Sequence, residues 1–193
     1  LFADGKVKLK ITGGTDVQWS PPVAYLTNIL LPQLRKYAKI DCKLLKRGFF
    51  PKGDGQIEIT ISPTFSLSDF PNQEAFLTAL KENISPTTFS RGNLAYIKGV
   101  SFASTDLQQA SVAERQAAAA TKALSSFNPI IQTEYADTLS TGSGIVLWAV
   151  FAQDDEINQK NPCILGANSL GEKGKEAETV GKEAATALQQ EME

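Results

Sequence analysis

Alternation between apolar and polar side chains predicts three strands in the first third of the chain. In residues 6–12, valine, leucine and isoleucine occupy every second position, and lysine or threonine the others. Successive side chains of a strand point to opposite faces, so this segment is expected to be a strand with one exposed face. Residues 40–47 and 56–62 are expected to be the second and third strands, and isoleucine alternates with polar residues in the latter.

Between the first two strands, apolar residues recur at spacings of three and four, which predicts a helix that ends near Lys39. Ser20 is expected to be its N-cap. Pro21 and Pro22 fit the first turn, where a missing N–H group costs nothing. Pro32 lies inside the pattern and is expected to kink the helix. The first part of the chain therefore has the predicted order β-α-β-β.

A change of composition marks a boundary after the third strand. Residues 64–90 are rich in proline, serine, threonine and phenylalanine, and we expect a connection with one short helix at 72–83. Asn72 is the candidate N-cap of that helix. The predicted organisation is therefore a unit at residues 1–63, this connection, and a second unit at residues 91–193.

The second unit is predicted to have the order β-α-β-β-β-α. Its expected elements are a strand at 93–104, a helix at 106–127, strands at 129–136 and 143–152, a short strand at 163–165, and a helix at 176–193. The segment 143–152 is apolar on both faces, so it is expected to be a central, buried strand. Together the two units predict an α+β protein in which helices pack on a mixed sheet.

Composition excludes several kinds of catalysis, because the chain contains no histidine. Ser-His and Cys-His nucleophile pairs, histidine-ligated metals and an imidazole base are therefore absent from it. Catalysis by this chain alone would have to use carboxylates, lysine, backbone dipoles or a metal held by oxygen ligands.

The net charge of −2 is distributed unevenly along the chain. Residues 1–63 carry 10 Lys and Arg against 5 Asp and Glu, whereas residues 64–193 carry 9 against 16. A basic first part and an acidic second part suggest two units with different partners. A basic face is only a weak indication of phosphate-backbone binding, and ordinary solvated lysines explain it equally well.

Cysteines and apolar runs bear on the compartment. Cys42 and Cys163 each lie in or beside an apolar run and are expected to be buried free thiols, with a structural disulfide as the alternative. No apolar run approaches the ~20 residues that span a bilayer, and the first residues lack a signal-peptide pattern. We therefore expect no membrane segment. The chain begins with Leu1, which suggests a piece of a longer protein.

The sequence ITGGTDVQWSPP at residues 11–22 places Gly13 and Gly14 between a strand and a helix start. Such a junction either is a simple strand-to-helix turn or holds an anion or a nucleotide edge through N–H groups and the helix dipole. It is not a phosphate-binding loop of the Walker type, because no Gly-Lys-Ser/Thr follows, and it is not a dinucleotide fingerprint. The spacing alone favours the simple turn.

The loop RGFFPKGDG begins at Arg47 and lies between two predicted strands. Pro51 presets a turn, and Gly53 and Gly55 permit positive φ, so a hairpin connection explains the loop fully. The alternative is a phosphate site, in which Arg47 and Lys52 supply the positive charge.

Two further segments are possible ligand-binding sites. Residues 166–185 contain glycines at 166, 171 and 174, which are expected to mark a loop before the last helix. A phosphate cradle is the alternative there, but the acidic residues of the segment oppose it. The acidic triplet at 154–156 is expected to be a solvated turn rather than a metal site.

Taken in order, these blocks resemble the RNA 3'-terminal phosphate cyclases. The blocks are GGTDVQWSPP, KRGFFPKGDGQIEITISP, RGN and SLGEKG followed by VGKEAA. The most specific is RGFFPKGDG, which is similar to the family's Arg-Gly-aromatic-aromatic-Pro-Lys-Gly-Gly-Gly. The resemblance extends from about Phe2 to the end of the chain.

The resemblance implies both a fold and an activity. Members of the family are built from repeated β-α-β-α-β-β units with a smaller inserted domain of thioredoxin-like arrangement. They use ATP and a divalent metal, Mg²⁺ or Mn²⁺, to adenylylate a histidine, and then pass AMP to an RNA 3'-phosphate. The neighbouring 2'-hydroxyl displaces AMP and leaves a 2',3'-cyclic phosphate. By this resemblance, residues 1–63 are part of one repeat, and the inserted domain begins near residue 91.

The resemblance also implies site residues. Pro21 matches a proline that packs on adenine in the family. The nucleotide site is expected to include Gly13, Gly14, Thr15 and Asp16 as well, and the RNA phosphate is expected to contact Arg47 and Lys52. No catalytic or metal-ligating residue is assigned within this chain, because the nucleophilic histidine of the family lies beyond it.

The chain departs from the family pattern in several places. Asp54 replaces a glycine; aspartate tolerates left-handed backbone geometry, but its charge beside Lys52 is expected to weaken a phosphate contact. The glycine-rich N-terminal segment, its arginines and a later Tyr/Asp/Gln group of the family are also missing. We therefore expect a central fragment of a cyclase that is inactive alone and that needs N- and C-terminal segments as partners, besides ATP and RNA 3' ends.

Two alternatives stay open at this stage. A non-catalytic cyclase-like protein that acts as a scaffold in ribosome or RNA processing is suggested by the lack of histidine. A free-standing nucleic-acid-binding module is suggested by the basic first part, but a pI of about 5.3 argues against it. All three hypotheses place the protein inside the cell, in the cytoplasm or the nucleus.

Overall fold

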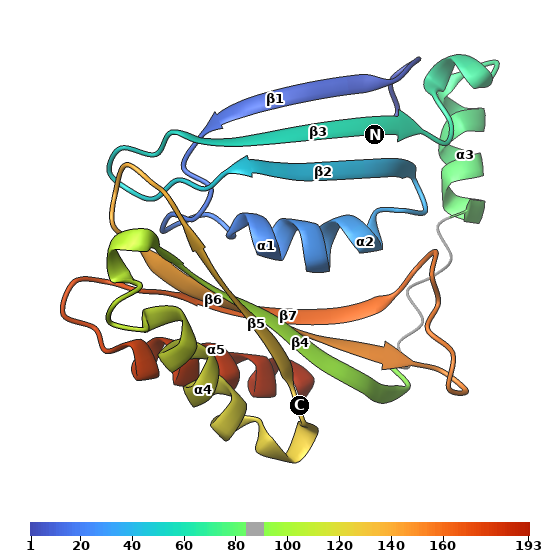
Figure 1. Ribbon diagram of the computed structural model, residues 1–193. Helices are drawn as coiled ribbons and strands as arrows, with labels where there is room; N and C mark the ends of the chain where they lie inside the picture. The colour runs from blue at the N-terminus through green and yellow to red at the C-terminus, as the bar shows by residue number, and fades with distance from the viewer. Residues whose placement is uncertain (84–90) are drawn as a thin grey trace.

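The computed structural model describes residues 1–83 and 91–193, and within them the strands form two separate sheets (Figure 1). In Figure 1 the first sheet lies above a short helical segment, which separates it from the second sheet, and two longer helices cover the far side of the second sheet. The α+β class predicted from the sequence is therefore correct.

The first sheet is antiparallel, with the strand order β1-β3-β2. Its strands are β1 (Val7–Gly13), β2 (Ala38–Lys46) and β3 (Gly55–Pro63), close to the predicted segments. The register places Leu9 opposite Ile59, and Ile59 opposite Cys42. The apolar side chains of the three strands therefore share one face of the sheet, as the alternation predicts.

The helical segment after β1 differs from its prediction at both ends. It consists of α1 (Val23–Tyr25), a π-helical turn η1 (Leu26–Leu30) and α2 (Leu31–Gln33). It begins later than expected because the Val23 N–H donates to the Thr15 carbonyl at 2.9 Å, so Ser20 does not cap it. It also ends at Gln33 rather than near Lys39, because Ala38 already starts the next strand.

The predicted disturbance at Pro32 takes the form of the π-helical turn. Proline has no N–H to donate, which interrupts the regular helical ladder at this point. The Leu31 N–H instead donates to the carbonyl of Leu26, five residues earlier, which widens the turn.

The connection carries a short 3-10 turn, η2 (Leu67–Asp69), and the predicted helix, α3 (Gln73–Asn83). Asn72 is its N-cap, as expected, because its side-chain oxygen accepts a hydrogen bond from the Ala75 N–H at 2.9 Å. Phe76 of α3 is buried and makes an edge contact with Phe2. The remainder of the predicted connection, residues 84–90, lies outside the described residues.

The second sheet has the strand order β5-β4-β6-β7. Its strands are β4 (Asn93–Ser104), β5 (Ile130–Ala136), β6 (Ser143–Ala152) and β7 (Cys163–Leu170). β4 and β5 are parallel, whereas β6 is antiparallel to both β4 and β7. The predicted order β-α-β-β-β-α is confirmed, and β6 is central and almost wholly buried, as expected.

Two helices cover one face of the second sheet, α4 (Val112–Ala123) and α5 (Ala177–Met192). α4 is shorter than predicted, because Ser111 adopts a positive φ of 51° just before it. The short 3-10 turns η3 (Thr105–Leu107) and η4 (Ser125–Phe127) occupy the rest of the predicted helix. The two helices pack closely through Gly181, where a Cβ would overlap the backbone of α4.

β7 is longer than predicted and includes Gly166, which we expected in a loop. The glycine serves packing rather than turning. A Cβ at this position would lie 2.6 Å from the Ile29 side chain, so its absence lets the helical segment of the first unit approach the second sheet. Glycine of this kind marks a close approach, which the sequence alone does not distinguish from a turn.

The remaining sequence expectations concern thiols, the acidic triplet and membranes. Cys42 and Cys163 are free thiols, as expected, but they are half-buried rather than buried. The acidic triplet lies in an exposed turn, as expected, closed by the bridge between Gln153 and Glu156. Among the helices of the described residues, none is both long enough and apolar enough to cross a membrane.

Candidate functional site

The two most specific sequence blocks of the first unit pack against each other. The Thr15 N–H donates to the Gly48 carbonyl at 2.9 Å, and the Gly48 N–H donates to the Thr15 hydroxyl, also at 2.9 Å. Asp16 and Phe49 form a further isolated β-bridge. The Gly-Gly-Thr-Asp turn and the RGFFPKGDG loop are therefore one structural unit, although they lie far apart in the sequence.

Glycines allow this close approach. Gly53 has the expected positive φ, 64°, and a Cβ there would lie 3.2 Å from the Gly13 backbone. Asp54 also adopts the left-handed region, with φ of 59°, which confirms that aspartate can replace glycine in this turn. Its carboxylate forms an ion pair with Lys46. Gly55, in contrast, has no positive φ; it is buried against Thr15, where a Cβ would lie 2.6 Å from the threonine methyl.

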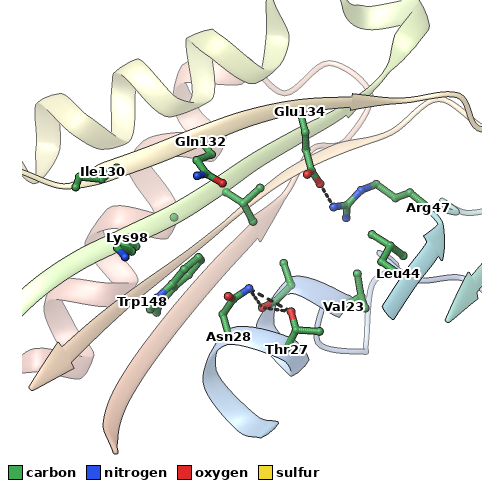
Figure 2. Close-up of a pocket in the computed structure, with 13 residues that line it drawn as sticks. Val23, Thr27, Asn28, Leu44, Arg47, Lys98, Ile130, Gln132, Glu134 and Trp148 are labelled. Atoms are coloured by element: carbon green, nitrogen blue, oxygen red, sulfur yellow. Dashed lines mark hydrogen bonds and ion pairs between the residues drawn. The ribbon is translucent and has the colours of Figure 1, made fainter. Parts of the chain in front are cut away.

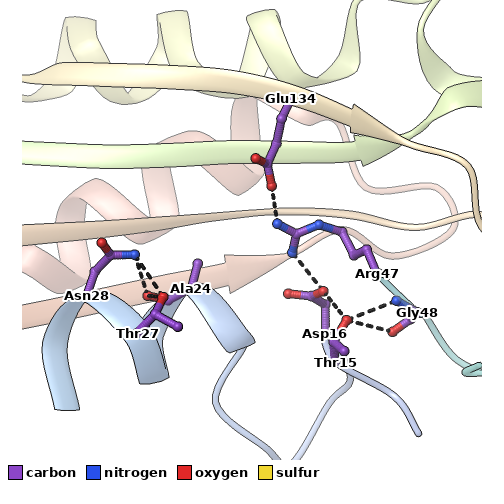
Figure 3. Close-up of polar contacts among 8 residues, drawn as sticks. All are labelled: Thr15, Asp16, Ala24, Thr27, Asn28, Arg47, Gly48 and Glu134. Atoms are coloured by element: carbon purple, nitrogen blue, oxygen red, sulfur yellow. Dashed lines mark hydrogen bonds and ion pairs between the residues drawn. The ribbon is translucent and has the colours of Figure 1, made fainter. Parts of the chain in front are cut away.

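Arg47 links the first unit to the second (Figure 3). Its guanidinium donates to Asp16 at 2.7 Å through one nitrogen and to Glu134 of β5 through another. The guanidinium carbon also lies 4.0 Å from the centre of the Phe102 ring. Arg47 is only 4% exposed and the Asp16 carboxylate is buried, so this contact is shielded from water, whereas the Glu134 side chain is 46% exposed.

This position bears on the expected phosphate contact of Arg47. Two guanidinium nitrogens already donate to carboxylates in the structure, and the side chain is buried. Lys52, the other expected phosphate ligand, is exposed, and its backbone N–H donates to the Ser140 hydroxyl at 3.0 Å. Phosphate binding by either residue stays a prediction, and Lys52 is the more accessible of the two.

Asp16 is the most unusual polar residue of this region. The Arg47 guanidinium and the Thr15 hydroxyl both donate to its Oδ2, each at 2.7 Å. Its Oδ1 is buried and has no hydrogen-bond partner within residues 1–83 and 91–193. Burial raises the pKa of the Asp16 carboxyl, because removal of water outweighs the stabilising charge of Arg47.

The aromatic part of the RGFFPKGDG loop is divided between the two units. The Phe49 ring is buried, stacks on Phe102 of β4 and lies directly over Gly142. The Phe50 ring, in contrast, is 75% exposed. The first ring therefore fixes the loop to the second unit, and the second ring is available for a ligand.

A cavity of about 900 Å³ lies where these segments meet. It is lined by the blocks from both units: Gly14, Asp16–Trp19, Phe49–Pro51, Gly53, Thr141–Ser143 and Leu170–Lys173. Gln18 crosses from one unit to the other by donating to Glu172 at 2.8 Å. Three of the four sequence blocks named above therefore contribute residues to one cavity: Gly14 and Asp16–Trp19 from the first, Phe49–Pro51 and Gly53 from the second, and Leu170–Lys173 from the last.

Trp19 lies at this cavity and is fully exposed. Its φ of 67° is in the left-handed region, which is rare for a bulky residue. Sequence reasoning did not single out this tryptophan, because its backbone geometry is invisible in the sequence. Strained residues of this kind concentrate at ligand sites, so Trp19 joins the candidate site residues.

The predicted nucleotide ligands differ in their relation to the cavity. Gly14 and Asp16 line it, and Gly13 and Thr15 belong to the same turn. Pro21 is exposed next to the start of α1 but is not part of the lining. Its packing against adenine stays a prediction.

Some residues of the cavity could contact an adenine nucleotide, although the carboxylates of Asp16 and Glu172 also belong to its lining. The exposed rings of Trp19 and Phe50 offer apolar faces to a purine, and Lys173 supplies a cation for phosphate. The same residues do not form a binding site for a divalent metal. The described part of the chain contains no group of three or more Asp, Glu or Cys side chains that could hold a metal ion. No step is therefore assigned to a metal held by these residues.

Arg47 belongs to the lining of a second cavity, of about 480 Å³ (Figure 2). In Figure 2, Asn28 and Thr27 of the helical segment face Trp148, Lys98 and Gln132 across it. No sequence motif marks this cavity. Its lining residues come from both units, and they lie close together only because the first unit packs against the second sheet.

Comparison with known proteins decides the family. The family model for the insert domain of RNA 3'-terminal phosphate cyclases matches residues 89–193, which is more than half of the chain. The chain belongs to the RNA 3'-terminal phosphate cyclase family. The match covers the second unit from just before β4 to the end of α5, so this unit corresponds to the cyclase insert domain.

Curated cyclases extend the similarity over the first unit. RNA 3'-terminal phosphate cyclase from Pyrococcus abyssi is 40% identical over 195 residues, covering 99% of this chain and 49% of the relative. The enzymes of the same name from Archaeoglobus fulgidus and Pyrococcus furiosus are 36% and 40% identical and cover 100% and 97% of this chain. The chain spans about half the length of the curated relatives it matches.

Proposed function

We propose that this chain is part of an RNA 3'-terminal phosphate cyclase that uses ATP to convert an RNA 3'-phosphate into a 2',3'-cyclic phosphate through transfer of AMP. The names of these relatives support this activity. The observation that carries the proposal is the meeting of blocks from both units in one cavity of about 900 Å³. The names of the relatives do not favour the scaffold alternative.

The proposed roles follow from position and charge. The turn from Gly13 to Asp16 forms one wall of the nucleotide site, and Pro21 packs on the adenine beside it. Lys52 contacts the RNA phosphate, since its side chain is exposed on the loop that borders the cavity. Arg47 acts from a buried position, where it holds Asp16 and the loop in place. The contribution of these residues is binding and charge neutralisation.

The chain alone is proposed to be inactive. The nucleophile of the family is expected to be a histidine, and this chain contains none. ATP and a divalent metal, Mg²⁺ or Mn²⁺, are the proposed cofactors of the complete enzyme, and the metal is expected to bind through residues outside this chain. We also infer a thioredoxin-like arrangement for the insert domain, supported by the strand order β5-β4-β6-β7 with β4 parallel to β5.

A chimera tests the proposed activity. The chain replaces the matching half of the Pyrococcus abyssi cyclase, and the chimera is given ATP, Mg²⁺ and an RNA with a 3'-phosphate. We expect a phosphatase-resistant cyclic end, with label from ATP attached covalently to the chimera but not to the 193-residue chain alone. The matched control carries the same segment of the Archaeoglobus fulgidus enzyme at the same junctions.

Two outcomes would contradict the proposal. If the control chimera cyclises RNA and the chimera with this chain does not, this chain does not belong to an active cyclase. If the 193-residue chain alone becomes labelled with AMP, the proposed inactivity is wrong.

The proposed contact of Lys52 with the RNA phosphate is tested by comparing Lys52→Ala with Lys8→Ala, where Lys8 is an exposed lysine of β1. Only the former should weaken RNA binding by the chimera and lower the salt dependence of log Kd, by about 0.7 per phosphate contact.

A further inference from the structure

The cavity of about 480 Å³ between the helical segment and the second sheet has a lining suited to a nucleic acid base (Figure 2). Trp148 of β6 lies opposite Lys98 of β4 in the strand register, and Lys98 lies opposite Ile130 of β5. The three side chains therefore form a row across neighbouring strands on one face of the sheet. Helices α4 and α5 cover the other face, so this row lies on the side that the cavity occupies.

The row offers an apolar surface for stacking. The Trp148 indole is half-buried in the lining, and Ile130 is 61% exposed although it is a large apolar side chain. The indole packs partly against the apolar cluster between the helical segment and the sheet, and it also lines the cavity. Aromatic side chains on a sheet are a common platform on which bases of single-stranded nucleic acids stack. Stacking accepts any base, because every base has a flat aromatic face.

The charges of the cavity favour an anionic ligand. Glu134 is the carboxylate of the lining, and it is paired with Arg47. Lys98 has no carboxylate partner within residues 1–83 and 91–193, and its ammonium lies 4.7 Å from the centre of the Tyr96 ring. A phosphodiester beside Trp148 would therefore meet a cation that no acidic group neutralises.

Two amide side chains complete the lining. The Asn28 amide nitrogen donates to the Ala24 carbonyl at 2.9 Å, which leaves the amide oxygen facing the cavity as an acceptor. Gln132 is exposed on β5 and lies across the cavity from Asn28. Amides of this kind hydrogen-bond the edge of an unpaired base, which is accessible only in a single strand. A space of this size suits one nucleotide and excludes a duplex.

We propose that this cavity binds one nucleotide of single-stranded RNA, with the base stacked on Trp148 and a phosphate at Lys98. The inference rests on the proposed function, because RNA is the substrate assigned there. The cavity shares no lining residue with the one formed by the family blocks. The ion pair of Arg47 with Asp16 lies between them, so an RNA strand that places its end in one cavity can place an upstream nucleotide in the other.

Binding of RNA to the 193-residue chain tests this site. The probe is a fluorescein-labelled single-stranded oligouridylate with a 3'-phosphate, followed by anisotropy at low and moderate salt. Trp148→Leu is expected to raise Kd about tenfold, which is the loss of one stacked base, whereas Trp148→Phe retains most of the affinity. The phenylalanine variant separates loss of stacking from loss of folding.

A charge variant tests the phosphate contact in the same assay. Lys98→Gln is expected to weaken binding and to reduce the slope of log Kd against log salt by about 0.7, the value for one phosphate contact on a single strand. Lys122→Gln is the matched control, because Lys122 is exposed on α4, which covers the opposite face of the sheet. It should leave both the Kd and the slope unchanged.

A fluorescence measurement locates the base directly. The chain has two tryptophans, so Trp19→Phe leaves Trp148 as the only indole. We expect RNA to quench its emission. Absence of quenching while anisotropy reports binding, an unchanged Kd in Trp148→Leu, or no RNA binding at all would each overturn the site. An inactive chimera together with a Trp148-dependent Kd would instead count against the proposed cyclase activity alone, so the two failures are distinguishable.

Discussion

The apolar side chains of β1 and β6, one strand from each sheet, differ greatly in their burial. In β6 of the second sheet nearly every residue is buried, whereas in β1 of the first sheet Leu9 and Ile11 are 41% and 47% exposed. Both strands belong to sheets whose apolar side chains align across the register. The difference lies in what covers them. Apolar alternation predicts a strand, but burial depends on elements contributed from elsewhere in the chain.

The helices explain the difference. α4 and α5 pack on the second sheet and close a core around residues such as Leu147 and Leu188. The helical segment of the first unit instead directs Ala24 and Ile29 to the second sheet, where they pack with Phe102. The first sheet is therefore held mainly by its attachment to the second sheet, and the attachment includes Arg47.

The largest expected effect comes from cutting that attachment. Arg47→Met leaves the buried Asp16 without its cation, and breaking a buried pair in this way costs about 3–5 kcal/mol of unfolding free energy. Lys46→Met is the matched control, since its pair with Asp54 is more than a third exposed and is worth about 1 kcal/mol or less. Urea unfolding followed by circular dichroism measures both. Equal losses in the two variants would show that Arg47 does not hold the units together.

The next prediction compares one substitution in the two sheets. Leu147→Ala in β6 removes a side chain with no exposure and should cost about 2–5 kcal/mol. Leu9→Ala in β1 removes a half-exposed side chain and should cost less than about 1 kcal/mol, because less apolar area is lost from the interior. Urea midpoints of the two variants give the comparison. A large loss at Leu9 would mean that this face is covered in solution, for example by a second copy of the chain.

A smaller effect is expected at the helix that packs beside the first sheet. Asn72→Ala removes the hydrogen bond to the Ala75 N–H and should destabilise the protein by about 1 kcal/mol. The exposed neighbour Gln73 is the control, and Gln73→Ala should change the unfolding free energy by about 0.5 kcal/mol at most. A loss confined to α3 would appear as faster amide exchange in that helix only. Identical exchange in the two variants would contradict the assigned cap.

The smallest predicted effect is a change in pH dependence. The pKa of Asp16 is raised by burial, so its contribution to stability is fully present below the pKa of the unfolded carboxyl and is lost as pH rises through the folded pKa. The unfolding free energy of the wild type should therefore fall, relative to that of Asp16→Asn, as pH rises from about 4 toward neutral. Parallel curves for the two proteins would show that burial does not shift this group.

The sequence predicted the strands better than the contacts between units. Alternation located β1 and β3, because the alternation of side chains along a strand depends only on neighbouring residues. The start of α1 was misplaced, because its first N–H group bonds to Thr15 rather than to a capping side chain. Gly166 was assigned to a loop, because a glycine used for close packing looks the same in the sequence as a glycine used for a turn.

The candidate site was predictable only in part. The Gly-Gly-Thr-Asp turn and the RGFFPKGDG loop were recognised as blocks, and both border one cavity. The pairing of Arg47 with Glu134 was not foreseen, because local patterns carry no information on which distant strand lies opposite a buried charge. No local sequence pattern distinguishes Trp148 or Lys98 either, because both line a cavity that forms only when the first unit packs against the second sheet.

The contact between Phe49 and Gly142 restricts how the two units of such a protein can be exchanged. A Cβ at position 142 would overlap the Phe49 ring, which is itself buried and stacked on Phe102. The ring and the missing side chain therefore fit each other across two segments of the chain. Cyclases that carry a larger residue at the position of Gly142 should carry a smaller one at the position of Phe49. An insert domain from one relative should therefore replace that of another only when its residue at the position of Gly142 leaves room for the partner's residue at the position of Phe49.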